Sequence, residues 1–215
     1  MSNIEESPTV HLIDDDEAVR NSICMSLTVE GFKVKEYPSA IEFLEKYNNQ
    51  PGCIIADIQM PKMNGLSLQQ HLIESKIHTP IIFITGHGNI PMSVKAVKLG
   101  AVDFIEKPFA KKILLDSIRN ALNIDVKNRE IDRSRQNIKN RYALLTSREK
   151  EVLRMLVKDH ATLTNKAIAE TLGISKRTIE VHRSNIMSKM LAQTRAELVE
   201  LSKICTFEDL EPTVN

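Results

Sequence analysis

The sequence predicts an α/β fold, a doubly wound five-stranded parallel sheet, followed by a smaller all-α helix-turn-helix domain. Three observations predict it. Short apolar runs alternate with helical stretches over residues 1–124. Polar residues follow most of these runs at their carboxyl ends. Residues 144–204 show only helical periodicity and carry many basic side chains.

Five apolar runs are predicted as strands. One alternates with polar residues and is expected at an edge, and the run that ends at Ala56 has the length of a buried central strand. The predicted strands are Thr9–Ile13, Phe32–Lys35, Cys53–Ala56, Pro80–Thr85 and Ala101–Ile105.

Apolar positions at helical spacing predict a helix after each strand. Asp16 and Glu17 are expected as acids at the N-terminus of the first helix, and Ser39 as the N-cap of the second. The five predicted helices span Ala18–Val29, Ala40–Tyr47, Leu66–Ile73, Met92–Leu99 and Ile113–Leu122.

Residues 125–143 are rich in charge and poor in apolar side chains. The apolar residues Ile124, Ile131 and Ile138 are spaced by seven, which suits one helix with a thin apolar stripe. Such a stripe fits either an extension of the fifth helix or a short coiled-coil seam. The alternative is a charged, solvated linker helix. The linker helix is the preferred interpretation.

The second domain begins at about residue 144. Thr146 and Glu149 form a predicted capping box, and Thr164 and Ser175 are positioned to begin two further helices. A short helix, a turn at Gly173 and a basic helix over 176–190 make a helix-turn-helix. A last helix over 195–204 follows. The predicted organisation is a domain over 1–124, a helical linker over 125–143, a second domain over 144–204 and a disordered tail over 205–215.

Charge divides unevenly between the two parts. Residues 1–124 carry 12 Lys and Arg against 15 Asp and Glu, a net of −3, while residues 125–215 carry 17 against 13, a net of +4. The basic part is therefore a candidate for nucleic-acid binding. The three cysteines form no C-x-x-C pair, and no apolar stretch approaches 18 residues, so we expect a cytoplasmic protein without a membrane partner.

Polar residues at strand ends suggest a phosphoryl-transfer site. Asp14 and Asp15, Asp57, Thr85 and Lys107 follow four different strands, whose carboxyl ends meet at one edge of a parallel sheet. Clustered carboxylates favour Mg²⁺, and one Asp beside the metal can act as nucleophile toward a phosphoryl group. Thr85 and Lys107 would stabilise charge on the phosphoryl oxygens. The alternative for Asp57 alone is a strand that ends in a solvated acid.

Residues 8–122 resemble the receiver domain of two-component response regulators, especially the FixJ branch. The resemblance rests on Asp14-Asp15, on Asp57 with Met60-Pro61 and Gly65, on Thr85-Gly86 and on Lys107-Pro108. It implies that Asp57 accepts phosphate from a sensor histidine kinase. It implies that Asp15, Asp57 and the carbonyl of Gln59 bind Mg²⁺, with Asp14 acting through water. It also implies Thr85 and Phe104 as a coupled switch pair; an ordinary strand side chain is the alternative for Phe104.

Residues 144–204 resemble the LuxR-type helix-turn-helix of the NarL/FixJ regulators, through Leu145–Glu149, Asn165–Ala169 and Ser175–His182. Two departures are an apparent insertion at His160–Thr162 and Leu191 where the family often has Gly. By resemblance, three residues face DNA bases: Glu180, Val181 and Ser184. The phosphate candidates are Lys176, Arg177, Thr178, Arg183, Asn185 and Lys189. Glu180 either accepts from cytosine N4 or is solvated, and His182 is expected to be packed and hydrogen-bonded.

These patterns together predict a transcription factor gated by phosphorylation, and not an enzyme. Its expected partners are a sensor histidine kinase, double-stranded promoter DNA, a second copy of the chain after phosphorylation, and RNA polymerase. One alternative is a haloacid-dehalogenase-type phosphatase, because Asp14 and Asp16 follow a strand. The sequence pattern of those phosphatases has Thr or Val at the position of Ala18. Another is a regulator gated by protein contact instead of phosphate.

Overall fold

The computed structural model describes residues 7–86, 90–158 and 164–204. The predicted insertion at His160–Thr162 and the predicted disordered tail over 205–215 lie outside the described residues. The chain divides into two compact units between Arg129 and Glu130. Each unit has its own buried core.

The first unit is built on a parallel five-stranded sheet, as predicted. Its strand order is β2-β1-β3-β4-β5, so the strand that ends at Asp57 is central and β2 is an edge strand. Every pairing in the sheet is parallel. The strands are β1 (Thr9–Ile13), β2 (Lys33–Tyr37), β3 (Gly52–Asp57), β4 (Ile81–Thr85) and β5 (Asp103–Glu106).

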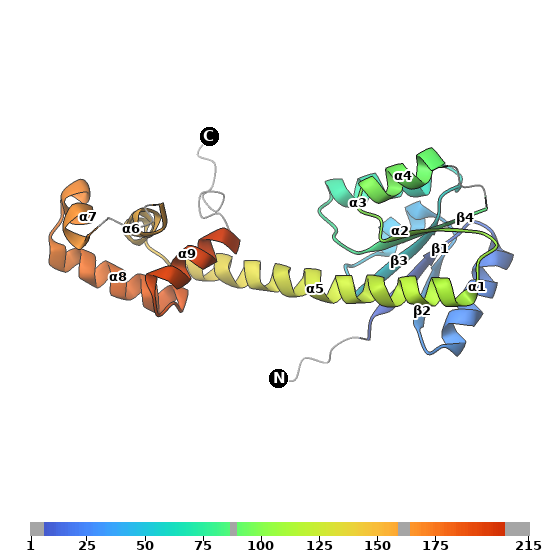
Figure 1. Cartoon of the computed structure of the whole chain (residues 1–215), viewed down its shortest axis with the longest axis horizontal. Helices are drawn as coiled ribbons and strands as arrows, with labels where there is room; N and C mark the ends of the chain where they lie inside the picture. Colours follow the sequence, from blue (N-terminus) through green and yellow to red (C-terminus); the bar gives the residue numbers. More distant parts are fainter. Residues whose placement is uncertain (1–6, 87–89, 159–163, 205–215) are drawn as a thin grey trace. The chain divides into compact units, whose positions relative to one another are not determined.

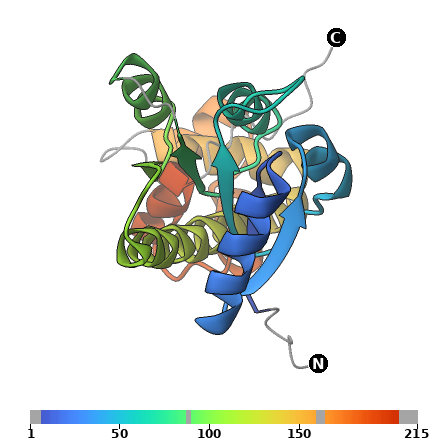
Figure 2. The same cartoon turned by 90° about the vertical axis from the view of Figure 1, so that its right-hand side faces the viewer.

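Helices cover both faces of this sheet (Figures 1 and 2). α2, α3 and α4 lie on one face, where Phe43, Leu68 and Ala96 belong to the same buried cluster as Phe83 of β4. α1 and α5 lie on the other face, where Leu27 and Ile118 reach the sheet. The helices are α1 (Glu17–Val29), α2 (Ala40–Lys46), α3 (Gly65–Glu74), α4 (Ile90–Lys98) and α5 (Lys111–Ala143).

The start of α3 fixes the loop after β3. Asn64 caps α3 by accepting from the backbone N–H of Ser67. Ser39 caps α2, as predicted, and Asp16, which the sequence predicts only as an acid at the N-terminus of α1, is the N-cap of that helix. A side chain on Gly65 would meet the carbonyl oxygen of Asp57 at 2.7 Å. Gly65 therefore lets α3 begin directly against the end of β3, which fixes the loop beside Asp57.

α5 is longer than the predicted fifth helix, because the predicted linker continues it to Ala143. The three isoleucines spaced by seven have unlike surroundings. Ile124 is half-buried, Ile131 is 48% exposed and Ile138 is 3% exposed in the core of the second unit. Asp125, which the sequence places in a solvated linker, is buried in the first unit.

The second unit is helical, as predicted. Ile138 and Tyr142 of α5 join its core together with Ile179, Ile186 and Met190, which line one face of α8. The capping box is reciprocal: Glu149 accepts from the Thr146 N–H, and Thr146 Oγ1 accepts from the Glu149 N–H. The remaining helices are α6 (Ser147–Lys158), α7 (Asn165–Leu172), α8 (Lys176–Met190) and α9 (Arg195–Ile204).

Candidate functional site

Two carboxylates end neighbouring strands at one edge of the sheet. Asp14 follows β1, and Asp57 is the last residue of β3. These strands are parallel and in register up to Ile13 and Ala56, so the two acids come next to each other. The Asp14 side chain is fully buried and Asp57 is 9% exposed. Buried acids this close need a cation to remain ionised together.

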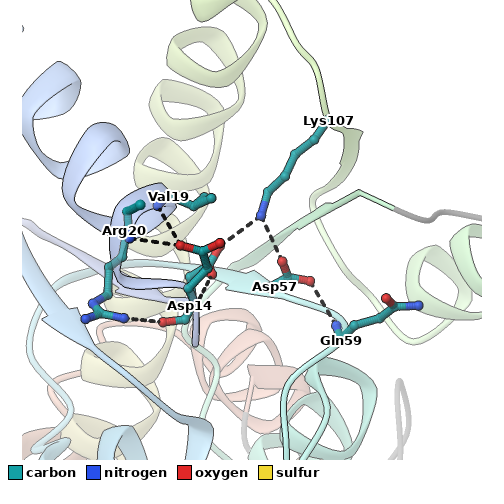
Figure 3. Close-up of polar contacts among 8 residues, drawn as sticks. Asp14, Val19, Arg20, Asp57, Gln59 and Lys107 are labelled. Carbon is teal, nitrogen blue, oxygen red and sulfur yellow. Dashed lines mark hydrogen bonds and ion pairs between the residues drawn. The ribbon is translucent and has the colours of Figure 1, made fainter.

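Lys107, which directly follows β5, supplies that cation (Figure 3). Its Nζ donates to Oδ2 of Asp14 at 2.9 Å and to Oδ2 of Asp57 at 2.8 Å. Burial raises the pKa of Asp14, and the hydrogen bond from Lys107 opposes the rise only in part. Burial lowers the pKa of Lys107, but its bonds to Asp57 and Asp14 outweigh burial and raise that pKa overall. Lys107 is therefore a protonated bridge between two acids.

Arg20 is a site residue that sequence reasoning missed. Its Nη1 donates to the carbonyl oxygen of Asp14 at 2.7 Å (Figure 3). Its Nε lies 3.9 Å from Oε2 of Glu36 on β2. The backbone N–H of Asp16 also donates to Oδ1 of Asp14 at 2.9 Å. A cation is unfavourable near a helix N-terminus. An arginine at the start of the predicted first helix is thus a weak signal of a tertiary partner.

The predicted metal ligands come from the ends of β1 and β3 and the residues that follow them. Oδ1 of Asp57 accepts from the Gln59 N–H at 2.9 Å, and both Asp15 and Gln59 are exposed residues. Within the part of the chain that the structure describes, no three His, Cys, Asp or Glu side chains are grouped to hold a metal ion. The oxygen donors of Asp14 and Asp57 nevertheless fit Mg²⁺, which takes one or two carboxylates and keeps several waters.

The predicted switch residues lie on β4 and β5. Thr85 ends β4 and is 1% exposed, at the same sheet edge as Asp57. Its carbonyl oxygen accepts from the backbone N–H of Lys107 at 2.8 Å. Phe104 pairs with Phe83 across the two strands, is half-buried and packs against the core beneath α2, α3 and α4.

The basic helix α8 presents most of the predicted DNA-contacting side chains to solvent. Ser175 caps it, and Gly173 ends α7 in the left-handed conformation. Val181 is 54% exposed. Oε1 of Glu180 lies 3.9 Å from Nζ of Lys176 in a solvated ion pair. The exposed members of the predicted set are Lys176, Arg177, Thr178, Glu180, Val181, Ser184 and Asn185.

Two predicted phosphate contacts are instead held by other side chains of the unit. Arg183 donates to Oδ1 of Asn165 on α7. Lys189 donates to Oε2 of the buried Glu149 at 2.6 Å. His182 is half-buried, so the packing expected of this residue is present. Its Nδ1 atom is buried and has no hydrogen-bond partner among the described residues, so the expected hydrogen bond is not made at that nitrogen.

Leu191, the predicted departure from the family turn, keeps the backbone conformation that glycine would take. Its φ is 53° and its ψ is 43°, in the left-handed region, and it forms the C-cap of α8. The substitution therefore leaves this turn in place and carries backbone strain.

Comparison with known families decides what these two units are. Residues 10–119 match the response regulator receiver domain, and residues 143–202 match the bacterial regulatory proteins of the luxR family. The chain belongs to the FixJ-like response regulators. Its relatives cover it almost end to end. The transcriptional regulatory protein FixJ of Azorhizobium caulinodans is 41% identical over 97% of this chain and 99% of its own length. FixJ of Rhizobium meliloti is 43% identical over 90% of this chain and 94% of its own length.

Solved structures agree with this assignment. The response regulator StyR, at 39% identity, superposes with a TM-score of 0.78 over 92% of this chain and 98% of its own. Full-length FixJ from B. japonicum, at 38% identity, superposes with a TM-score of 0.55 over 92% of this chain and 96% of its own.

A response regulator of this family is a transcriptional regulator that works with a sensor kinase and DNA, and phosphorylation-dependent control is its general mechanism. Receiver domains of this kind generally bind Mg²⁺ at the phosphorylation site. In the described ranges, none of the helices is both long and apolar enough to span a membrane.

Proposed function

We propose that Asp57 is the phosphoacceptor of this response regulator and that phosphorylation controls its binding to promoter DNA. The observation that carries the proposal is the bridge from Lys107 to both Asp14 and Asp57 at one sheet edge. Lys107 Nζ lies 2.8 Å from Oδ2 of Asp57, and an Asp carboxylate is the nucleophilic form of this side chain. Asp57 is also the more exposed of the two acids, so a phosphodonor reaches it first.

The proposed reaction uses groups that are already in position. A carboxylate oxygen of Asp57 attacks the phosphorus of a phosphohistidine on a sensor histidine kinase, forming a P–O bond as the P–N bond breaks. The histidine leaves with the bonding electron pair and takes up a proton. The ammonium of Lys107 then faces phosphoryl oxygens in place of the Asp57 charge, which stabilises the developing negative charge.

Mg²⁺ is the proposed cofactor of this reaction. Asp15, Asp57 and the carbonyl of Gln59 would hold it, with Asp14 acting through water. An ion held by these residues would supply positive charge against the phosphoryl oxygens. Arg20 supports the same region, because it holds the backbone of Asp14 just before Asp15.

We propose Thr85 and Phe104 as the switch that reports phosphorylation. A phosphoryl group adds about −1.5 to −2 charges next to the buried Thr85 hydroxyl. Movement of Thr85 toward that charge would free space for Phe104 on the neighbouring strand. The α4–β5 surface would then change shape and bind a second copy of the chain. On that surface, Val94 and Lys95 of α4 are exposed, and Val102 and Asp103 beside them are half-buried.

The proposed DNA contacts are those on the solvent side of α8. Its helix-turn-helix geometry suits the major groove. Glu180, Val181 and Ser184 would face bases, while Lys176, Arg177, Thr178 and Asn185 would contact phosphates. Arg183 and Lys189 would have to leave Asn165 and Glu149 to contact DNA. Paired domains would bind half-sites about 10 base pairs apart, and RNA polymerase is the proposed next partner.

The phosphatase alternative fits the geometry less well. Its nucleophile would be Asp14, which is fully buried and accepts bonds at both carboxylate oxygens. Its acid would be Asp16, whose Oδ1 caps α1 through Ala18 and Val19. We therefore propose that the chain does not turn over phosphate esters.

Mapping the phosphoryl group tests the site assignment. The full chain is incubated with acetyl phosphate and Mg²⁺, reduced with borohydride to fix the acyl phosphate, digested and sequenced by mass spectrometry. Modification at Asp57 is expected, with none in Asp57→Asn. Modification at Asp14, or steady release of phosphate without an adduct at Asp57, would overturn the assignment.

A further inference from the structure

A short stretch of α5 is bonded to the start of the strand that carries Asp57. Oδ2 of Asp125 accepts from the backbone N–H of Gly52 at 2.9 Å. It also accepts from Nε of Arg129, one turn later, at 2.8 Å. The two remaining guanidinium nitrogens donate to the carbonyls of Asn49 at 3.0 Å and Gln50 at 2.7 Å. We call these two side chains and their bonds to residues 49–52 the α5 clamp.

The α5 clamp is buried and its geometry is specific. The Asp125 residue is 3% exposed, and the Arg129 side chain is 21% exposed. A buried carboxylate without its partners is costly, so these groups stay together once the helix docks. Arginine's planar fork makes three directed bonds here, which a lysine could not make.

Its backbone partners are themselves held firmly. A Cβ atom on Gly52, whose φ is +152°, would lie 1.8 Å from the carbonyl oxygen of Thr9. The first residue of β3 is therefore in close backbone contact with β1. The N–H of Thr9 donates to the Pro51 carbonyl at 2.8 Å. One helical position before Arg129, Asn128 Nδ2 donates to the carbonyl of His78 at 3.3 Å, ahead of β4.

The α5 clamp and the proposed phosphoacceptor thus occupy opposite ends of β3. Gly52 is the first residue of that strand and Asp57 is the last. Every residue of β3 is buried, so displacement at one end cannot be absorbed by solvent. The α5 clamp also marks the end of the first unit, because the second unit begins at Glu130.

From this arrangement we propose that Asp125 and Arg129 are positioning residues that couple the receiver to the DNA-binding unit. They make residues 125–129 of α5 part of the receiver, so that residues 130–143 leave it as a continuous helix whose start moves with β3. Residues 138 and 142 of that helix are core residues of the DNA-binding unit. The proposal rests on the proposed function, since coupling requires phosphorylation to control DNA binding.

The test compares the full-length chain with three variants. Arg129→Met keeps the aliphatic stem and removes all three bonds of the fork, while Arg129→Lys keeps the charge and loses the fork. Arg133→Met is the matched control, because Arg133 lies one turn later on the same helix and is exposed. The DNA is a duplex selected from random sequence with the wild-type chain in Mg²⁺ and beryllofluoride, a phosphoryl mimic.

Three quantities are measured: beryllofluoride binding, hydrogen exchange at Gly52, and the ratio of DNA affinities with and without beryllofluoride. In wild type this ratio is expected in the range of roughly 5–150 typical of allosteric coupling. Arg129→Met should bring it close to one while beryllofluoride binding is kept and Gly52 exchanges faster. Arg129→Lys should give an intermediate ratio, and Arg133→Met the wild-type ratio.

An unchanged ratio in Arg129→Met would overturn the proposal. So would loss of beryllofluoride binding in Arg129→Lys, because the residue would then serve only the fold of the receiver. A wild-type ratio of one would instead refute the proposed function, and the coupling role with it.

Discussion

The Nζ of Lys107 lies 2.8 Å from Oδ2 of Asp57, across 50 positions of sequence. β4 lies between β3, which ends at Asp57, and β5, which directly precedes Lys107, so the lysine side chain reaches across the carboxyl end of β4. Thr85 ends that strand. A phosphoryl group on Asp57 would therefore meet Lys107 and Thr85 together, which is why one lysine links the chemistry to the proposed switch.

Replacing Lys107 with Met should slow phosphorylation by acetyl phosphate by about 100-fold, the usual effect of removing one preorganised charge donor. The same change leaves the buried Asp14 without its cation, so the pKa of Asp14 should rise further. Lys111→Met is the control, because the pair of Lys111 with Glu30 is largely exposed. Labelling rates are measured by intact mass. A wild-type rate in Lys107→Met would contradict the role given to this lysine.

His11 predicts a pH dependence of stability. It is buried in β1 among the rings of Tyr37, Phe43 and Tyr47, and burial, aided by Lys35, Arg129 and Lys33, lowers its pKa to about 4. The unfolded chain binds this proton more tightly. The free energy of unfolding should therefore rise as pH increases from about 4 to the ordinary value of 6.5, by up to about 3 kcal/mol.

Urea unfolding at several pH values measures this slope. His11→Phe should remove most of it. Tyr37→Phe, which removes the 3.1 Å hydrogen bond to His11 and keeps the imidazole, should retain it. Equal slopes in wild type and His11→Phe would show that another group titrates.

Leu191 carries backbone strain that glycine would relieve. Its φ is 53° and its side chain is 68% exposed, so little packing is lost on substitution. Leu191→Gly should raise the free energy of unfolding of the second unit by about 0.5–1 kcal/mol, the left-handed penalty less the entropy cost of glycine. Leu191→Val should lower it, because a branched residue fits this region worst. Exchange of buried amides in α8 reports both effects, and slower exchange in the valine variant than in the glycine variant would contradict the interpretation.

Lys176 and Lys189 lie on the same helix and should respond differently to substitution. Lys176 is exposed, and removing it should reduce the slope of log affinity against log salt by about 0.9, one phosphate contact. Lys189→Met should leave the salt slope unchanged and destabilise the unit, because the buried Glu149 loses the partner that helps to lower its pKa. Binding titrations at several salt concentrations and urea unfolding separate the two. A reduced salt slope in Lys189→Met would assign it to DNA.

Local sequence rules predicted most of the fold. The five strands, the edge position of β2 and the helix caps at Ser39 and Thr146 depend on periodicity and on side chains within a few residues of each other. The observed strand limits differ from the predicted ones by one or two residues at several ends. β5, for example, begins at Asp103 and not at the predicted Ala101. Asp14, Asp57 and Lys107 could be placed together because the ends of parallel strands share one edge.

The remaining features depend on distant backbone. Asp125 and Arg129 look like solvated linker charges in the sequence, and only the fold brings the backbone of residues 49–52 to them. Arg20 is similar, since its partner is a carbonyl group, which leaves no trace in side-chain patterns. Lys189 is predicted as a phosphate contact because it is basic, and its bond to the buried Glu149 side chain, 40 positions away, comes from the fold.

A DNA-binding titration of wild type and Asp57→Asn, each with Mg²⁺ and with or without beryllofluoride, shows whether a phosphoryl group on Asp57 controls DNA binding. We expect beryllofluoride to tighten binding by wild type, by roughly 5–150-fold, and to leave Asp57→Asn at the affinity of the unmodified chain. The same tightening in Asp57→Asn, or none in wild type, would refute control through Asp57.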